Sequence, residues 1–390
     1  MILTVSSREI GSRQNLIFDG TSWSWSSDIP ENSLLWGFDR PSDLKDAAQS
    51  LGLNIQTFWD TPWGKAQSQI QSTKGCVLWQ YVMPFAMWKS HIENLVNQLW
   101  INFTDEDNSY YVKTHLRNRR IIWQLSRPTV SRQLYQQAAS GKSINLEKLK
   151  PDHSGKIGRS KYSFSKTVTG RMTITDGPNI LTLKKESRRI FQSQHPGGKI
   201  VEIDLQSAEP RVALSLFGKS VQGDIYEHVS SSLNLDIDRK TAKVATISAL
   251  YGASQHALRE QLGCNSNAIK VLESVKEYFG VHHIEKMIQA QHEKLSYISN
   301  THGRKIFSDA PSVNHFVQSS TVDVAFDVFE SLLEKIKDMK IEAVPLYIIH
   351  DGIVLDVSAE GFVKLADLCK DGFESKTIRT NFPVRIKEIK

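Results

Sequence analysis

The stretch KIVEIDLQSAEPR, residues 199–211, decides how the rest of the chain is interpreted. Its apolar run, residues 200–203, predicts a strand that ends on Asp204. Pro210 and the ALSLF segment around residues 213–217 indicate that the chain then leaves the sheet. A carboxylate at the exposed end of a buried strand can hold a divalent cation. Because many strands end in Asp, this feature alone indicates a metal site only weakly.

A second stretch, RKTAKVATISALYG at residues 239–252, predicts a helix. Arg239, Lys243, Ile247 and Tyr251 are four residues apart, so they share one helical face. That face can offer two cations to a triphosphate and an aromatic ring to a base or sugar. An ordinary amphipathic helix with exposed cations explains this stretch equally well when it is taken alone.

A third stretch, PLYIIHDGIVLDV at residues 345–357, predicts two apolar strands joined at Asp351-Gly352. Asp-Gly is also a favoured hairpin turn, so the dipeptide alone indicates a turn and nothing more. His350 and Asp351 follow a strongly apolar strand, as Asp204 does.

In this order the three stretches resemble motifs A, B and C of the polymerase I-like (family A) DNA polymerases. The resemblance implies an α+β right-hand fold, with an antiparallel palm sheet, helical fingers and a short helical thumb. In that fold Asp351 lies beside Asp204. The implied activity is template-directed addition of dNTPs to a primer 3′-hydroxyl.

Two Mg²⁺ ions, for which Mn²⁺ can substitute, are the cofactors that the resemblance implies. Their protein ligands are Asp204, Asp351 and the backbone carbonyl of Leu205. Arg239 and Lys243 are expected to hold the triphosphate, and Lys243 is the candidate to protonate the departing pyrophosphate. The other nucleotide-binding residues implied by the resemblance are Tyr226, Ile247, Tyr251 and Glu209, which is expected to fill the space of a ribose 2′-hydroxyl.

The segment TGRMTITDGPNILTLKKESRRIF, residues 169–191, also resembles a family A segment. It implies that Arg171 contacts the primer–template near the active site, with Asn179 as a further DNA contact. Arg188 and Arg189 occupy matching positions. A polar loop with incidental arginines is the alternative. DNA contacts implied elsewhere by the resemblance are Arg304, Gln318 and His350.

The chain is expected to divide into several regions: a module of unknown role (residues 1–85), a thumb-like helical region (86–155), the first part of the palm (156–217), the fingers (218–300) and the second part of the palm (301–390). A helical period between Met87 and Trp100 supports the second region. Within the last region, Ser319 and Ser320 are expected to cap a core helix.

Proofreading is not expected. An exonuclease metal site needs clustered carboxylates, starting with an Asp-x-Glu pair on one strand. No such pair occurs in residues 1–150, and the TDEDNS segment around residues 104–109 reads as a solvated loop. The first 85 residues are therefore interpreted as a module without catalytic carboxylates, such as an exonuclease remnant.

Composition is that of a soluble globular protein, with 40% hydrophobic residues and no apolar run long enough to span a membrane. Three widely spaced cysteines, Cys76, Cys264 and Cys369, indicate a reduced, cytoplasmic protein. Residues 113–189 hold 18 Lys and Arg against four Asp and Glu, which indicates phosphate contact, and a solvated charged face is the alternative. The expected partners are primer–template DNA, dNTPs, and a processivity factor or other replication proteins, without a membrane.

Three departures from the family pattern predict looser packing on the incoming nucleotide. Gly352 replaces a glutamate, Ile247 an aromatic residue and Tyr226 a histidine. Lower fidelity or altered sugar selection is the expected consequence. Two alternatives remain: a single-subunit phage-type RNA polymerase or primase-like enzyme, which Gly352 fits and Glu209 opposes, and an inactive polymerase-like subunit that binds nucleic acid.

Overall fold

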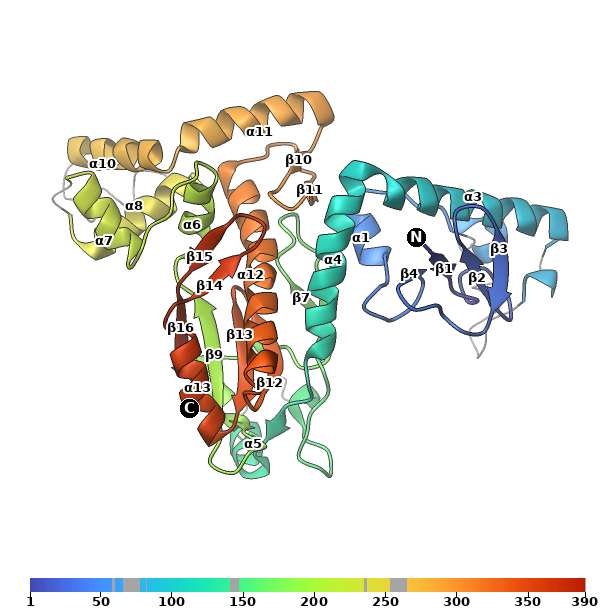
Figure 1. Cartoon of the computed structure of the whole chain (residues 1–390), viewed down its shortest axis with the longest axis horizontal. Helices are drawn as coiled ribbons and strands as arrows, with labels where there is room; N and C mark the ends of the chain where they lie inside the picture. Colours follow the sequence, from blue (N-terminus) through green and yellow to red (C-terminus); the bar gives the residue numbers. More distant parts are fainter. Residues whose placement is uncertain are drawn as a thin grey trace. The chain divides into compact units, whose positions relative to one another are not determined.

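Two compact units make up the described part of the chain, Met1–Trp123 and Gln124–Lys390. The computed structural model describes residues 1–57, 60–65, 78–81, 83–140, 147–234, 237–252 and 265–389 (Figure 1). Cys369 is a buried free thiol. Cys76 and Cys264 lie outside the described residues. No helix in the described ranges is both long and apolar enough to cross a membrane.

A four-stranded antiparallel sheet lies at the centre of the second unit. Its order is β12 (Ala343–Ile349), β13 (Gly352–Val357), β9 (Lys199–Leu205) and β16 (Val384–Glu388). The expected strand before Asp204 and the expected hairpin are both confirmed. The hairpin turn lies at residues 350–351, one residue earlier than the sequence indicated, because Gly352 already pairs with β9.

Helices gather at one end of this unit (Figure 1) and share one apolar core. They are α6 (Ala208–Ser215), α7 (Ile225–Ser232), α8 (Arg239–Tyr251), α10 (Asn265–Tyr278), α11 (Val281–Leu295) and the start of α12 (Val313–Asp338). The helix expected at 239–251 is confirmed. Asp238 caps it by accepting from the Thr241 N–H, and Gly252 ends it at φ +65°.

The expected start of α12 was wrong. Its N-cap is Ser312, which forms a capping box with His315 seven residues before Ser319. Ser319 and Ser320 lie inside the helix and are fully buried. Their side chains face a neighbouring loop, where Asn300 donates to the Ser319 hydroxyl and Thr301 N–H donates to the Ser320 hydroxyl.

Short elements complete the second unit. They are β5 (Thr129–Val130), α5 (Arg132–Ser140), η3 (Glu147–Leu149), β6 (Lys161–Ser163), β7 (Thr173–Asp176), η4 (Ile180–Thr182), η5 (Lys185–Ile190), β8 (Phe191–Gln192), β10 (Ile298–Ser299), β11 (Lys305–Ile306), α13 (Ala359–Leu368), β14 (Phe373–Ser375) and β15 (Thr380–Phe382). The apolar core formed by residues of η4, η5 and β8 includes Ile200, Val354 and Ile349, so this layer packs against one face of the sheet.

The first unit is a small sheet packed on helices. Its strands, in the order β3-β2-β1-β4, are β1 (Leu3–Val5), β2 (Asn15–Phe18), β3 (Trp23–Ser26) and β4 (Leu34–Trp36). Its helices are α1 (Lys45–Ser50), η2 (Trp79–Tyr81), α3 (Phe85–Thr104) and α4 (Glu106–Gln124). The helical period expected from Met87 to Trp100 is confirmed, since α3 buries the apolar positions that define it.

The boundary between the two units lies after Trp123, and not at residue 85 as expected. The buried face of α3 joins one core with the strands of the first unit. Residues 86–123 therefore belong with the N-terminal module, and 86–155 is not one structural unit. The TDEDNS segment is also not a loop: Asp105 ends α3, while Glu106 and Asp107 form the exposed first turn of α4.

Candidate active site

Asp204 and Asp351 come together at the end of the central sheet. Gly352 lies directly opposite Asp204 in the β13–β9 pair. Asp351 precedes Gly352 in the turn, and its carbonyl accepts from the Leu205 N–H at 3.2 Å. The backbone ladder therefore fixes two carboxylates from distant parts of the sequence at one sheet end, as the sequence predicted.

The surroundings of Asp351 disfavour the negative charge of its carboxylate. Burial, and then the negative charge of Asp204, raise its pKa to about 6. A buried carboxylate beside a like charge is the environment that a divalent cation relieves. The adjacent His350 adopts φ +54°, a strained conformation for a non-glycine residue.

Lys387 on β16 pairs with Asp204, with Nζ 2.8 Å from Oδ2. The lysine side chain is 42% exposed and the aspartate side chain 28% exposed. A half-exposed pair on a flexible lysine stem contributes little to stability. Lys387 is therefore a counter-ion that can swing away from Asp204, and it does not close this position to a metal.

The donor set suits hard cations. Carboxylate oxygens are the ligands that Mg²⁺ and Mn²⁺ prefer. Within the described ranges, no cluster of three or more His, Cys, Asp or Glu side chains could hold a metal by itself. Asp204 and Asp351 could thus supply two oxygen ligands to such a cation, whose remaining ligands would be oxygens from water or from a bound phosphate.

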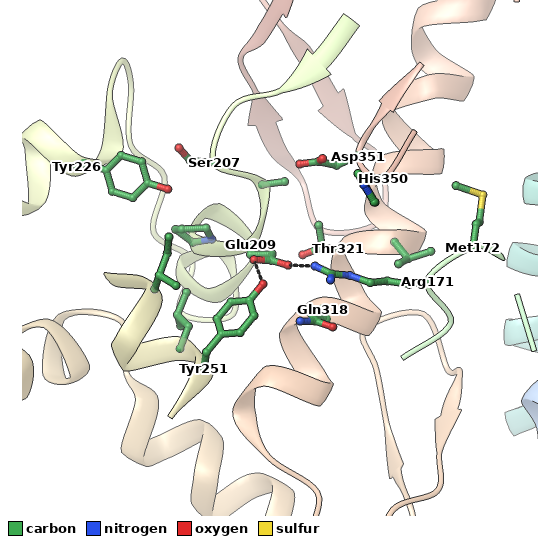
Figure 2. Close-up of a pocket in the computed structure, with 15 residues that line it drawn as sticks. Arg171, Met172, Ser207, Glu209, Tyr226, Tyr251, Gln318, Thr321, His350 and Asp351 are labelled. Carbon is green, nitrogen blue, oxygen red and sulfur yellow. Dashed lines mark hydrogen bonds and ion pairs between the residues drawn. The ribbon is translucent and has the colours of Figure 1, made fainter. Parts of the chain in front are cut away.

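Beside Asp351 lies a cavity of about 340 Å³ (Figure 2). Glu209 sits between two partners there: it accepts from Tyr251 Oη at 2.5 Å and from Arg171 Nη2 at 2.9 Å. Burial, followed by this contact with Glu209, raises the pKa of Tyr251 to about 12, so the phenol keeps its proton. The cavity also contains these residues predicted from the sequence: Tyr226, Ile247, Gln318 and His350.

His350 lines this cavity in surroundings that favour its neutral form. Burial lowers the pKa of its imidazole, and the nearby charges of Arg171 and Arg188 lower it further. A neutral imidazole can donate one hydrogen bond and accept another. His350 therefore offers polar contacts to a ligand without adding charge.

A second cavity, of about 260 Å³, adjoins Asp204. Arg239 and Lys243 of α8 line it together with Leu205 and Tyr226, as the sequence predicted. Arg239 is held by Asp224, whose Oδ2 accepts from Nε at 2.9 Å and from Nη2 at 2.6 Å. Its guanidinium also lies 5.5 Å from the centre of the Tyr226 ring. Tyr226 lines both cavities and so connects them.

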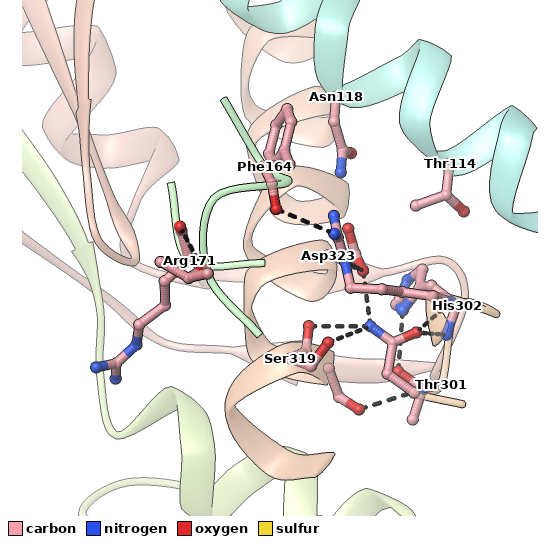
Figure 3. Close-up of polar contacts among 12 residues, drawn as sticks. Thr114, Asn118, Phe164, Arg171, Thr301, His302, Ser319 and Asp323 are labelled. Atoms are coloured by element: carbon pink, nitrogen blue, oxygen red, sulfur yellow. Dashed lines mark hydrogen bonds and ion pairs between the residues drawn. The ribbon is translucent and has the colours of Figure 1, made fainter. Parts of the chain in front are cut away.

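Arg304 does not reach these cavities, which corrects its expected role as a DNA contact. It is 2% exposed, and its Nε lies 3.5 Å from the buried carboxylate of Asp323 (Figure 3). Its Nη1 donates to the carbonyl of Phe164 at 3.3 Å. Gly170 packs on the guanidinium at φ +72°, and a Cβ there would lie 2.5 Å from Arg304 Cζ. Arg304 thus supports the loop that presents Arg171.

Asn179 also lies away from the two central cavities. It lines a separate cavity with Lys148, Thr175 and Leu183. It lines neither of the two cavities described beside Asp204 and Asp351, so its expected contact with DNA is not part of the same cluster.

Sequence reasoning missed several residues that line these cavities or pair with Asp204. Asp224 was given no role from the sequence, although its side chain caps α7 and holds Arg239. Arg385 and Lys387 lie in a VRIKE strand whose alternation is typical of any edge strand. Their role depends on pairing with β9, which no local pattern reveals. Met172, Ser207 and Thr321 were also missed.

Comparisons with known proteins agree on one family. The family model for DNA polymerase family A matches residues 130–388. DNA polymerase I of Lactococcus lactis subsp. lactis (strain IL1403) is 24% identical over 300 residues, which cover 67% of this chain and 34% of that protein. DNA polymerase I of Lactococcus lactis subsp. cremoris (strain MG1363) is 23% identical with the same coverage. The chain thus spans about a third of the length of these relatives.

A solved structure shows the same fold. The POL domain of Pol1 from M. smegmatis, in complex with DNA primer-template and dNTP, matches with a TM-score of 0.58 at 16% identity. The match covers 94% of this chain and 82% of that one. The expected α+β right-hand fold is thereby confirmed. The family model spans Asp204, Asp351, helix α8 and the loop that carries Arg171, and it matches more than half of the chain. The chain therefore belongs to DNA polymerase family A.

Proposed function

We propose that this chain is a template-directed DNA polymerase that adds dNTPs to a primer 3′-hydroxyl with two Mg²⁺ ions. The observation that supports this most strongly is the β13–β9 register, which sets Asp351 beside Asp204. In the reaction the 3′-oxygen forms a bond to the α-phosphorus, and the bond to the bridging oxygen of pyrophosphate breaks. Bound metal ions supply charge neutralisation and lower the pKa of the attacking hydroxyl.

The side chains of this protein have separate tasks in the proposed reaction. Asp204 and Asp351, with the Leu205 carbonyl, hold the cations. Arg239 and Lys243 line the cavity beside Asp204, where they bind the triphosphate. Lys243 is positioned to protonate pyrophosphate as it leaves. The protein thus contributes positioning and electrostatic stabilisation, and phosphoryl transfer needs little else.

Glu209 supports DNA over RNA as the product. Tyr251 and Arg171 hold its carboxylate between them, so the side chain cannot easily turn aside to admit a ribose 2′-hydroxyl. Gln318, His350 and Arg171 line the same cavity and are proposed to contact the primer–template. Asn179 is proposed to contact DNA farther from the site.

We further propose the absence of proofreading, based on the first unit. Strands β1 to β4 carry the segments LTV, NLIF, WSWS and LLW, which contain no carboxylate.

We also assign residues 156–217 and 301–390 to the palm and residues 218–300 to the fingers. Ile247 and Tyr226, which line the cavity beside Asp351, support looser selection of the incoming base.

Primer extension tests the proposed function. Wild-type protein, Mg²⁺ and a 5′-labelled primer–template should give stepwise extension that follows the template sequence when dNTPs are supplied. Extension with rNTPs alone would favour an RNA polymerase. A primer that stays unextended with dNTPs and rNTPs, in Mg²⁺ and in Mn²⁺, while the protein still binds it, would support an inactive relative.

A further inference from the structure

The edge strand β16 places two cations on the same sheet face as Asp204. Arg385 lies directly opposite Asp204 in the antiparallel β16–β9 pair, and Lys387 lies opposite Glu202. Residues that face each other across an antiparallel pair project to the same side. Arg385 therefore projects toward the catalytic face of the sheet, and it lines the cavity beside Asp204 with Arg239 and Lys243.

Most cations near this cavity already have partners. Arg211 is 3% exposed and donates to the carbonyls of Gln206, Val221 and Gly223. Arg239 pairs with Asp224, and Lys387 pairs with Asp204. Among the described residues, no carboxylate lies within ion-pair distance of Arg385 or Lys243.

Two cations that have no carboxylate partner in the described part of the chain therefore line one small polar cavity. Charged residues on an edge strand also discourage aggregation, which would explain Arg385 without a ligand. Arg385 is exposed, as that explanation requires. Exposure alone does not account for Arg385 lining the cavity together with Lys243 of a helix from another part of the fold.

We infer that Arg385 is a further triphosphate-binding residue, which contacts the β- and γ-phosphates of the incoming dNTP and then the pyrophosphate. This inference rests on the proposed function of the site. A guanidinium binds phosphate oxygens through two parallel N–H bonds, so it suits the polyphosphate end of the ligand. Because Arg385 contacts groups that are present before and after the reaction, it acts on binding and leaves the chemical step unchanged.

Arg385→Ala tests the inference, with Arg385→Lys as the conservative variant. Arg379→Ala, an exposed arginine in the same unit that lines none of the three cavities described, is the matched control. Single-nucleotide extension should show a KM for dNTP raised roughly tenfold or more in Arg385→Ala, with kcat little changed. Inhibition by pyrophosphate should weaken by a similar factor, while the KM for DNA stays constant. Arg385→Lys should recover part of the loss.

A measurement without catalysis separates this inference from the proposed function. Calorimetric binding of inorganic pyrophosphate, with Mg²⁺ present, should weaken roughly tenfold in Arg385→Ala relative to wild type and Arg379→Ala. Thermal unfolding establishes that the variants are folded. If Arg385→Ala matches Arg379→Ala in pyrophosphate binding, or wild type binds no pyrophosphate, the inference is wrong. Failure of wild type to extend a primer would instead overturn the proposed function.

Discussion

At the scale of single residues, Asp351 shows a conflict between the stability of the fold and the proposed binding of a cation. The turn that carries it keeps a carboxylate partly buried beside another carboxylate. Such an arrangement opposes folding when no cation is bound, so it points to function and not to stability.

The raised pKa of Asp351 predicts a pH-dependent gain in stability for Asp351→Asn. Its pKa is about 6 when folded and near 3.8 when unfolded, so the charged form costs free energy above pH 6. That cost disappears as the pH falls toward 4. In metal-free buffer at pH 7.5, the variant should be more stable than wild type by up to about 3 kcal/mol.

Urea unfolding between pH 7.5 and pH 4.5 measures this difference. The exposed Asp371→Asn serves as the control for an aspartate outside the site. A gain for Asp351→Asn that stays constant across the range would show that burial and the charge of Asp204 do not act on this carboxyl.

Glu209 is predicted to set the choice of sugar. If Glu209 fills the space of a 2′-hydroxyl, as proposed, Glu209→Ala should lower the preference for dNTPs over rNTPs roughly 10- to 100-fold. Ratios of kcat/KM for dNTP and rNTP incorporation measure it. Tyr251→Phe removes only the hydrogen-bond donor and should have a smaller effect. An unchanged ratio in Glu209→Ala would assign sugar selection to another group.

At the scale of elements, the sequence predicted the helices and strands that are marked by the pattern of their own residues. Helix α8 follows from a helical spacing of four residues, strand β9 from a continuous apolar run, and the β12–β13 hairpin from its two apolar strands. The start of α12 was misplaced because Ser319 and Ser320 resemble a cap in sequence, whereas their hydroxyls are held by residues of a distant loop. Arg304 was misjudged for a similar reason: an arginine carries no local signal of burial.

The loop before Arg171 is predicted to depend on Gly170. Gly170→Ala combines φ +72° with a close approach to the buried Arg304, so it should destabilise the fold by roughly 2–4 kcal/mol. It should also raise the KM for primer–template by displacing Arg171. Gly158→Ala is the matched control, because a Cβ there meets nothing within 4 Å. Equal unfolding midpoints for the two variants would show that Arg304 does not restrict this loop.

For the whole molecule, the division into two units separates two optical signals. All nine tryptophans lie in residues 23–123, within the first unit, while both cavities next to the aspartates lie in the second. Tryptophan fluorescence therefore reports the unfolding of the first unit, and circular dichroism reports both units.

Nucleotide should stabilise only one of these units. A dNTP with Mg²⁺ at about 100 times its Kd should stabilise the second unit by about 2.7 kcal/mol. The part of the dichroism transition that fluorescence does not follow should move, while the fluorescence transition stays in place. Two probes that coincide and move together would show that the units unfold as one.

The pair of aspartates is the central claim, and one kinetic comparison tests it most directly. Asp204→Asn, Asp351→Asn and the double variant are compared in Mg²⁺-dependent single-nucleotide incorporation, with Asp371→Asn as the control. If the two carboxylates hold shared metal ions, each single variant should lose about a thousandfold or more in kcat/KM. The double variant should be little worse than either single variant, because the residues act as a unit. Activity retained in both single variants, or losses that multiply in the double variant, would contradict a shared metal site.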